Sequence, residues 1–132
     1  MMESTRYDLS RFRGRIIRDA VSTFRTASYF QGRGQPAAGL AQTVSEGLLD
    51  LLEEGPSRDY ETVKLYAEWL YNLIRKDGKK IDTTMDFLDT FENVVTRYLP
   101  NKEDTDVDVF FEMCRDIVQR RHDELLRRGA GR

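Results

Sequence analysis

Four arginines near the start of the chain have a spacing that could bind a polyanion: Arg11, Arg15, Arg18 and Arg25. On a helix they would share one face, beside an apolar stripe. Such a row could contact nucleic-acid phosphates, and each contact would add salt-dependent affinity. The remainder of the chain is acidic and the pI is about 5.5, which opposes polyanion binding. We therefore expect the row to pair with acidic helices or with an acidic protein partner rather than with nucleic acid.

Acidic residues recur on consecutive turns later in the chain, at Asp82, Asp86, Asp89 and Glu92. Paired carboxylates can act as general acid and base or can bind hard cations. Here they alternate with an apolar face, which is typical of a solvated helix surface. The segment 103–108 has alternating acidic residues, as a calcium-binding loop does, but it lacks the central glycine and the final glutamate of such a loop. We therefore expect its acidic residues to cap a helix. No metal site is predicted.

The chain has one cysteine, Cys114, and one histidine, His122. These counts exclude an internal disulfide, a thiolate zinc cluster and the usual multi-histidine metal sites. Cys114 lies on an apolar stripe and is predicted to be buried and structural, and His122 is predicted to lie at the surface rather than to bind haem. With no nucleophile motif and no phosphate loop, we expect neither an enzyme nor a cofactor.

The elements that would position these residues are helices, because apolar residues recur at three-and-four spacing and not in alternation. One domain over residues 1–132 is expected, with frayed ends at 1–7 and 129–132. Its fold is predicted to be an all-α, compact, globin-like bundle of five helices. The first predicted helix covers about 9–30, with Asp8 as its N-cap, and the second begins at 36 and ends at 55–56. The third covers about 60 to 77–78, the fourth begins at 82 and ends before Pro100, and the fifth covers about 107–128.

The distribution of charge and the hydropathy of the chain indicate in which compartment the protein is expected. Residues 1–35 carry seven arginines against three acids, whereas residues 36–100 carry seven basic residues against twelve acids. The apolar runs are too short for a transmembrane helix or a secretory signal, so a cytoplasmic protein without a membrane partner is expected.

Surplus apolar residues are the strongest functional signal in the sequence. The third helix is apolar on more than one face, so it is either central in the bundle or in contact with a second subunit. Three aromatic residues could line an apolar ligand pocket: Tyr66, Trp69 and Phe91. Apolar residues of the first and last helices are the candidate homodimer interface, namely Phe12, Ile16, Ile17, Phe24, Ile117, Val118 and Leu125.

The order of several short segments resembles one family. The segments are LLDLLEEG over 48–55, YAEWL over 66–70, KDG over 76–78, DTT over 82–84, FLDTF over 87–91 and YL over 98–99. Over about residues 38–126 this pattern is similar to the N-terminal sensor domains of the RsbR type, which are haem-free, globin-like domains of bacterial stress signalling. The resemblance implies a dimeric sensory or scaffolding module, often joined by its last helix to an output domain. Because this sequence ends at Arg132, a stand-alone relative or an excised sensor is expected.

Two functions follow as expectations. The first is a non-enzymatic signalling, sensor or scaffolding module that acts through homodimerisation and contacts with a protein partner in a stress response. The alternative is a small nucleic-acid-associated or regulator-binding protein that uses the arginine row of the first helix.

Overall fold

The computed structural model describes residues 2–27, 30–31, 36–75, 81–99 and 105–130 of the chain, with side chains for 9–27, 30–31, 36–75, 81–99 and 106–128. Within these residues it has five α-helices and one short 3₁₀ turn, which confirms the all-α, five-helix prediction. The elements are α1 (Met2–Phe24), α2 (Ala37–Glu53), η2 (Gly55–Ser57), α3 (Tyr60–Arg75), α4 (Ile81–Thr96) and α5 (Thr105–Ala130). None of the described helices has the length and hydrophobicity needed to cross a bilayer.

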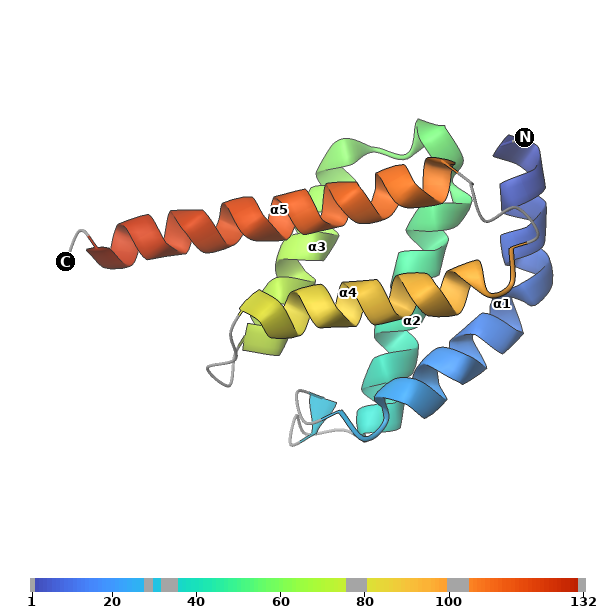
Figure 1. Cartoon of the computed structure of the whole chain (residues 1–132), viewed down its shortest axis with the longest axis horizontal. Helices are drawn as coiled ribbons and strands as arrows, with labels where there is room; N and C mark the ends of the chain where they lie inside the picture. The colour runs from blue at the N-terminus through green and yellow to red at the C-terminus, as the bar shows by residue number, and fades with distance from the viewer. Residues whose placement is uncertain (1, 28–29, 32–35, 76–80, 100–104, 131–132) are drawn as a thin grey trace.

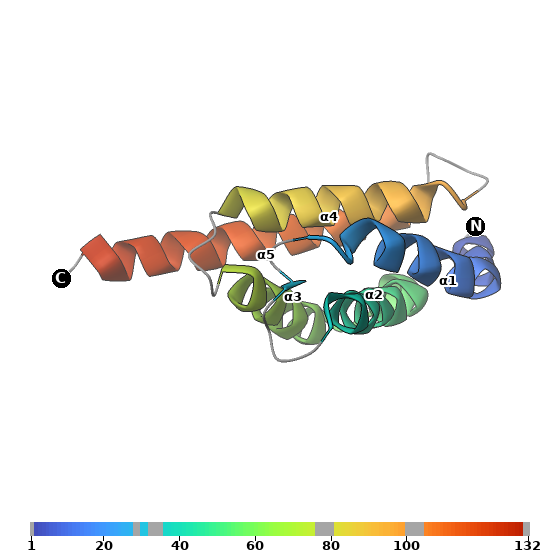
Figure 2. The same cartoon turned by 90° about the horizontal axis from the view of Figure 1, so that it is seen from below.

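The helices form two layers. α4 and α5 lie side by side in opposite directions, and α2 and α3 form a second pair that crosses beneath them (Figures 1 and 2). α1 lies at the edge of the bundle, where it packs on α2 and on α4. The last turns of α5 extend beyond the rest of the bundle in both views. A globin-like arrangement of these helices stays a prediction.

The helix boundaries agree best with the prediction where glycine and proline end a helix. α2 ends just before Gly55, whose φ of 69° is the left-handed conformation that glycine adopts without strain. α1 differs more, since it begins at Met2 and ends at Phe24, so Asp8 lies inside the helix instead of capping it. The helical conformation also includes residues 2–7 and extends to Ala130, where frayed ends were predicted.

Aromatic rings join α1, α4 and α5 in the core. The ring centroid of Phe87 on α4 lies 4.5 Å from that of Phe24 and 6.1 Å from that of Phe91. The ring centroid of Phe91 lies 6.1 Å from that of Phe111 on α5. Phe87, Phe91 and Phe111 are fully buried. The core therefore depends on contacts between α1, α4 and α5 that are far apart in the sequence.

The prediction of the dimer interface is wrong for most of its residues, because they are buried. Ile16, Phe24, Ile117 and Val118 are at most 3% exposed, because they pack inside the bundle of their own chain. They offer no surface to a second subunit in this fold. The other three predicted residues, Phe12, Ile17 and Leu125, are partly buried and pack against the same core.

A buried ion pair joins the segment before α3 to the start of α5. Arg58 donates two hydrogen bonds to the Asp106 carboxylate, from Nη1 to Oδ1 at 3.1 Å and from Nη2 to Oδ2 at 2.8 Å. Its Nε and Nη2 also donate to the carbonyl oxygens of Leu51 and Leu52, which are among the last carbonyls of α2. The Arg58 guanidinium lies 5.0 Å from the Phe110 ring centroid. One side chain thereby ties the end of α2 to α5.

Candidate functional site

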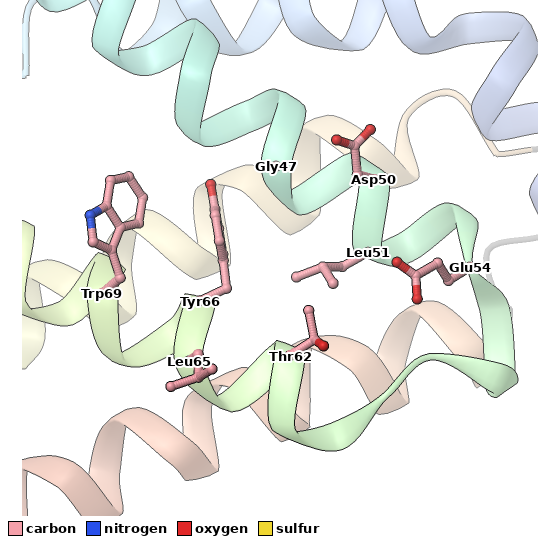
Figure 3. A pocket seen from close by; sticks show the side chains of 8 residues that line it. All are labelled: Gly47, Asp50, Leu51, Glu54, Thr62, Leu65, Tyr66 and Trp69. Atoms are coloured by element: carbon pink, nitrogen blue, oxygen red, sulfur yellow. The ribbon is translucent and has the colours of Figure 1, made fainter.

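A groove opens between α2 and α3 on the described surface, and we call it the α2/α3 groove. Its volume is about 510 Å³, and Figure 3 shows the side chains around it. Tyr66 and Trp69 rise from α3 toward α2, and Thr62 of α3 points toward Leu51 of α2 across the gap. The eight lining residues are Gly47, Asp50, Leu51, Glu54, Thr62, Leu65, Tyr66 and Trp69.

Close contact between the Tyr66 ring of α3 and Gly47 of α2 shapes the floor of the groove. A Cβ atom at this position would lie 2.6 Å from Cζ and 2.7 Å from Cε1 of Tyr66, so only glycine leaves room for the ring. The ring is fixed because Tyr66 Oη donates a hydrogen bond of 2.9 Å to the Val44 carbonyl oxygen. Burial raises the pKa of the Tyr66 hydroxyl, and the nearby charge of Asp50 raises it further, so the hydroxyl stays a donor.

The open side of the groove is apolar. Leu65 is 65% exposed and Trp69 is 41% exposed, although both are large hydrophobic residues. The Trp69 ring lies 5.2 Å from that of Tyr66, at an angle of 42°, so the half-buried tyrosine supports the exposed indole. Two exposed apolar residues one helical turn apart form a continuous patch, which is more informative than one isolated residue.

The α2 side of the groove is acidic. Asp50 and Glu54 are exposed and line it. Asp50 also accepts an ion pair of 2.8 Å from Arg13 of α1, and Arg13 reaches Glu53 at 3.2 Å. The predicted row was expected to pair with acidic helices, but the arginine of α1 that pairs with α2 is Arg13, which is not one of the four. Its position one turn after buried Leu9 and one turn before Ile17 is the signal that could have identified it.

Two of the three residues predicted to line an apolar ligand pocket lie in one groove, and the third does not. Tyr66 and Trp69 lie together in the α2/α3 groove, but Phe91 is fully buried between Phe87 and Phe111 and does not reach it. The spacing of apolar residues places Phe91 on the apolar face of its helix but does not indicate which other helix covers it. Gly47 and Leu51 were missed, because the contact of α2 with α3 is not encoded locally.

The predicted arginine row lies on the surface of α1. All four of its residues are exposed, and the ion pairs within the described part of the chain do not involve them. The guanidinium carbons of two lie near the Phe12 ring, that of Arg11 at 5.1 Å and that of Arg15 at 5.8 Å from its centroid. Arg11 and Arg15 thus cover an apolar ring while their charges remain in water.

The predicted acidic surface of α4 is partly used inside the fold. Asp82, Asp86 and Asp89 are exposed, but Asp89 and Glu92 both bind Arg115 of α5. The described residues contain no group of three or more histidine, cysteine or acidic side chains arranged to hold a metal ion.

Cys114 and His122 lie on α5 in different settings. Cys114 is 1% exposed, which confirms the prediction of a buried cysteine. His122 is half-buried and not simply at the surface, since its Nδ1 lies 2.8 Å from Tyr71 Oη on α3. That hydrogen bond joins α3 to α5.

Burial makes Cys114 unreactive while the protein is folded. Burial raises the pKa of the Cys114 thiol from its ordinary 9.0 to about 12, so at about pH 8 the native thiol has almost no thiolate. A disulfide reagent should react with the native protein orders of magnitude more slowly than with the protein in urea. Because the folded pKa is the higher one, stability is retained below about pH 9 and falls as the pH rises toward 12. Equal labelling rates in the two states would contradict this burial.

Comparisons with known proteins add no family assignment. No protein-family model matches the chain, and neither a curated protein nor a solved structure matches it. What is shown is an all-helical bundle of five helices within the described residues.

Proposed function

We propose that the protein is a non-enzymatic signalling or scaffolding module that works through protein–protein contacts, with the α2/α3 groove as its main contact surface. The observation that carries the proposal is the exposure of Leu65 and Trp69 beside Tyr66 in one groove. Exposed apolar surface with a polar rim is typical of protein-binding sites, and Trp and Tyr are enriched among the contacts that dominate binding energy. A partner helix would lie along the groove with its apolar residues against Leu65 and Trp69.

Charge indicates what kind of helix fits. Residues 37–75 carry seven acidic and three basic residues, a balance of −4, and two of the acids, Asp50 and Glu54, line the groove. A basic partner gains electrostatic attraction there, and a guanidinium over the exposed face of Trp69 gains a cation–π contact. The expected partner is an amphipathic helix with arginine or lysine beside its apolar residues.

The resemblance to RsbR-type sensor domains supports the signalling part of the proposal. It implies a globin-like, dimeric, haem-free module in a bacterial stress response. The finer identification belongs to the proposal and rests on the sequence segments that carry the resemblance.

Trp69 provides a direct test, because it is the only tryptophan in the chain. We expect a synthetic helical peptide of leucine and arginine to shift its fluorescence to the blue with a Kd in the micromolar range, as the indole leaves water. A peptide with glutamate in place of arginine should bind at least about tenfold more weakly, and one with serine in place of leucine should leave the emission unchanged. No shift with the first peptide at up to about 1 mM would refute the proposal.

A substitution at Gly47 should separate binding from folding. In Gly47→Ala the new methyl group displaces the Tyr66 ring and breaks its hydrogen bond to Val44, at a cost of about 1 kcal/mol. Alanine favours the helix by about 1 kcal/mol, so the free energy of unfolding should change little while peptide affinity falls about tenfold.

Gly39→Ala is the matched control for this variant. It lies in the same helix, and a methyl group there would meet nothing within 4 Å. It should raise the free energy of unfolding by up to about 1 kcal/mol and leave peptide affinity unchanged. Equal affinities for both variants would show that the Tyr66 ring does not shape the binding site.

A further inference from the structure

We propose that the α2/α3 groove receives residues 119–128 of a second copy of this chain, and that two copies exchange these segments reciprocally. We call this segment, the last described side chains of α5, the α5 tail. The inference rests on the proposed function, because it names the occupant of the same groove. A reciprocal exchange related by a two-fold axis is closed, so it yields dimers instead of filaments.

The outward face of the α5 tail has the surface that the groove requires, whereas His122 and Leu125 on its inner face pack against their own chain. Leu126 is 59% exposed, and Arg127 and Arg128 beside it are exposed as well. The ion pairs between described residues leave Arg127 and Arg128 out, whereas Arg120 pairs with Asp116 and Arg121 with Glu124. An exposed leucine followed by two available guanidinium groups forms a small basic and apolar surface.

Complementary charge favours this occupant over others on the chain. Residues 119–128 carry four arginines and two acids, a balance of +2, against −4 for residues 37–75. α1 is also basic, but its described exposed residues include no large hydrophobic side chain. Only the α5 tail, among the described helices, combines an exposed apolar anchor with arginines, and it would place them near Leu65, Trp69 and Asp50.

The shape of the molecule makes the contact intermolecular. α5 is one unbroken helix, and its last turns extend past α3 and α4, away from α2 (Figures 1 and 2). The tail cannot reach the groove of its own chain without breaking that helix. A second copy is therefore needed to bring the two surfaces together.

The expected dimer is reversible. Two to three helical turns cover less than the roughly 800 Å² that each partner contributes to a standard stable interface. We expect a Kd in the micromolar range that rises with salt, because the arginine–carboxylate attraction is screened. The monomer of 15.4 kDa should predominate at low concentration.

The test follows mass and Trp69 emission together for the full chain. Sedimentation equilibrium across the micromolar range should show a mass that rises from 15.4 kDa toward twice that value. The emission of Trp69 should shift to the blue with the same midpoint. A single mass of 15.4 kDa at all concentrations would overturn the proposal, as would a dimer that leaves Trp69 emission unchanged.

Paired variants locate the contact. Leu126→Ser and Leu65→Ser should each raise the Kd of the dimer about a hundredfold. Each tail–groove contact should lose roughly tenfold in affinity, and a symmetric dimer contains two such contacts. An equimolar mixture of the two should recover part of the affinity, since one tail and one groove remain intact. Val109→Ser, an equally exposed apolar residue elsewhere on α5, is the control and should leave the dimer unchanged. A dimer that is insensitive to Leu126→Ser would refute the assignment.

The two proposals fail in different ways. If the chain stays monomeric while the leucine–arginine peptide still shifts Trp69 emission, the groove binds a helix and the α5 tail is not its partner. If neither the peptide nor a second copy changes the emission, both proposals are wrong.

Discussion

Asp106→Ala should lower the free energy of unfolding by about 3–5 kcal/mol. The substitution leaves Arg58, whose side chain is only 3% exposed, without the carboxylate that accepts two of its hydrogen bonds. A buried charge without its counter-ion carries the full cost of its removal from water. Urea denaturation followed by circular dichroism measures the loss.

Two further variants keep this prediction testable if Asp106→Ala does not fold. Asp106→Asn retains one oxygen acceptor and the size of the side chain, so its loss should be smaller than that of alanine. Asp116→Ala removes an exposed aspartate of the same helix that pairs with Arg120, and should cost less than about 0.5 kcal/mol. A cost for Asp106→Ala as small as that for Asp116→Ala would contradict the structural role of the buried pair.

Phe91→Ala should cost about 3–5 kcal/mol of unfolding free energy. The side chain is fully buried, with ring neighbours at 6.1 Å on two sides, so its removal leaves a cavity between α4 and α5. Chemical denaturation of the variant gives the magnitude, and Phe91→Leu, with a smaller loss of volume, should cost less.

Trp69→Ala is the contrast, because the sequence assigned both aromatic residues to one pocket. Trp69 is 41% exposed, so its loss should destabilise the fold much less than that of Phe91 while abolishing binding of the leucine–arginine peptide. Calorimetric titration follows binding where the indole signal is lost. Equal destabilisation by the two substitutions would mean that Trp69 belongs to the core.

The sequence predicts the helices well because their signals are local. The apolar spacing and the glycine at position 55 depend only on neighbouring residues, and α2 ends where they indicate. The prediction of α1 was less accurate at both ends. Asp8 has the residue type of a cap although the helix continues before it, and the predicted helix extended to residue 30 although α1 ends at Phe24. A capping residue type permits a helix start but does not require one.

The sequence does not reveal which apolar faces meet. Ile117 and Val118 were assigned to a dimer interface as apolar residues of the last helix, yet the other helices of the same chain cover them. Arg58 lies in a short segment between two helices, and its buried partner Asp106 lies 48 residues away in the sequence. For the groove, Trp69 was identified by its type, but Gly47 matters only through its closeness to Tyr66 of another helix. Such contacts arise from tertiary packing and leave no periodic signal.

The most direct measurement is a ¹⁵N–¹H correlation spectrum of the full chain, titrated with the leucine–arginine peptide. Trp69 contributes the only indole N–H signal, because the chain has one tryptophan. We predict that this signal and the amide signals of residues 47–54 and 62–69 shift together with a single micromolar Kd. Shifts centred on Arg11, Arg15 and Arg18 of α1, or an unchanged indole signal at saturating peptide, would contradict the assignment of the α2/α3 groove as the binding surface.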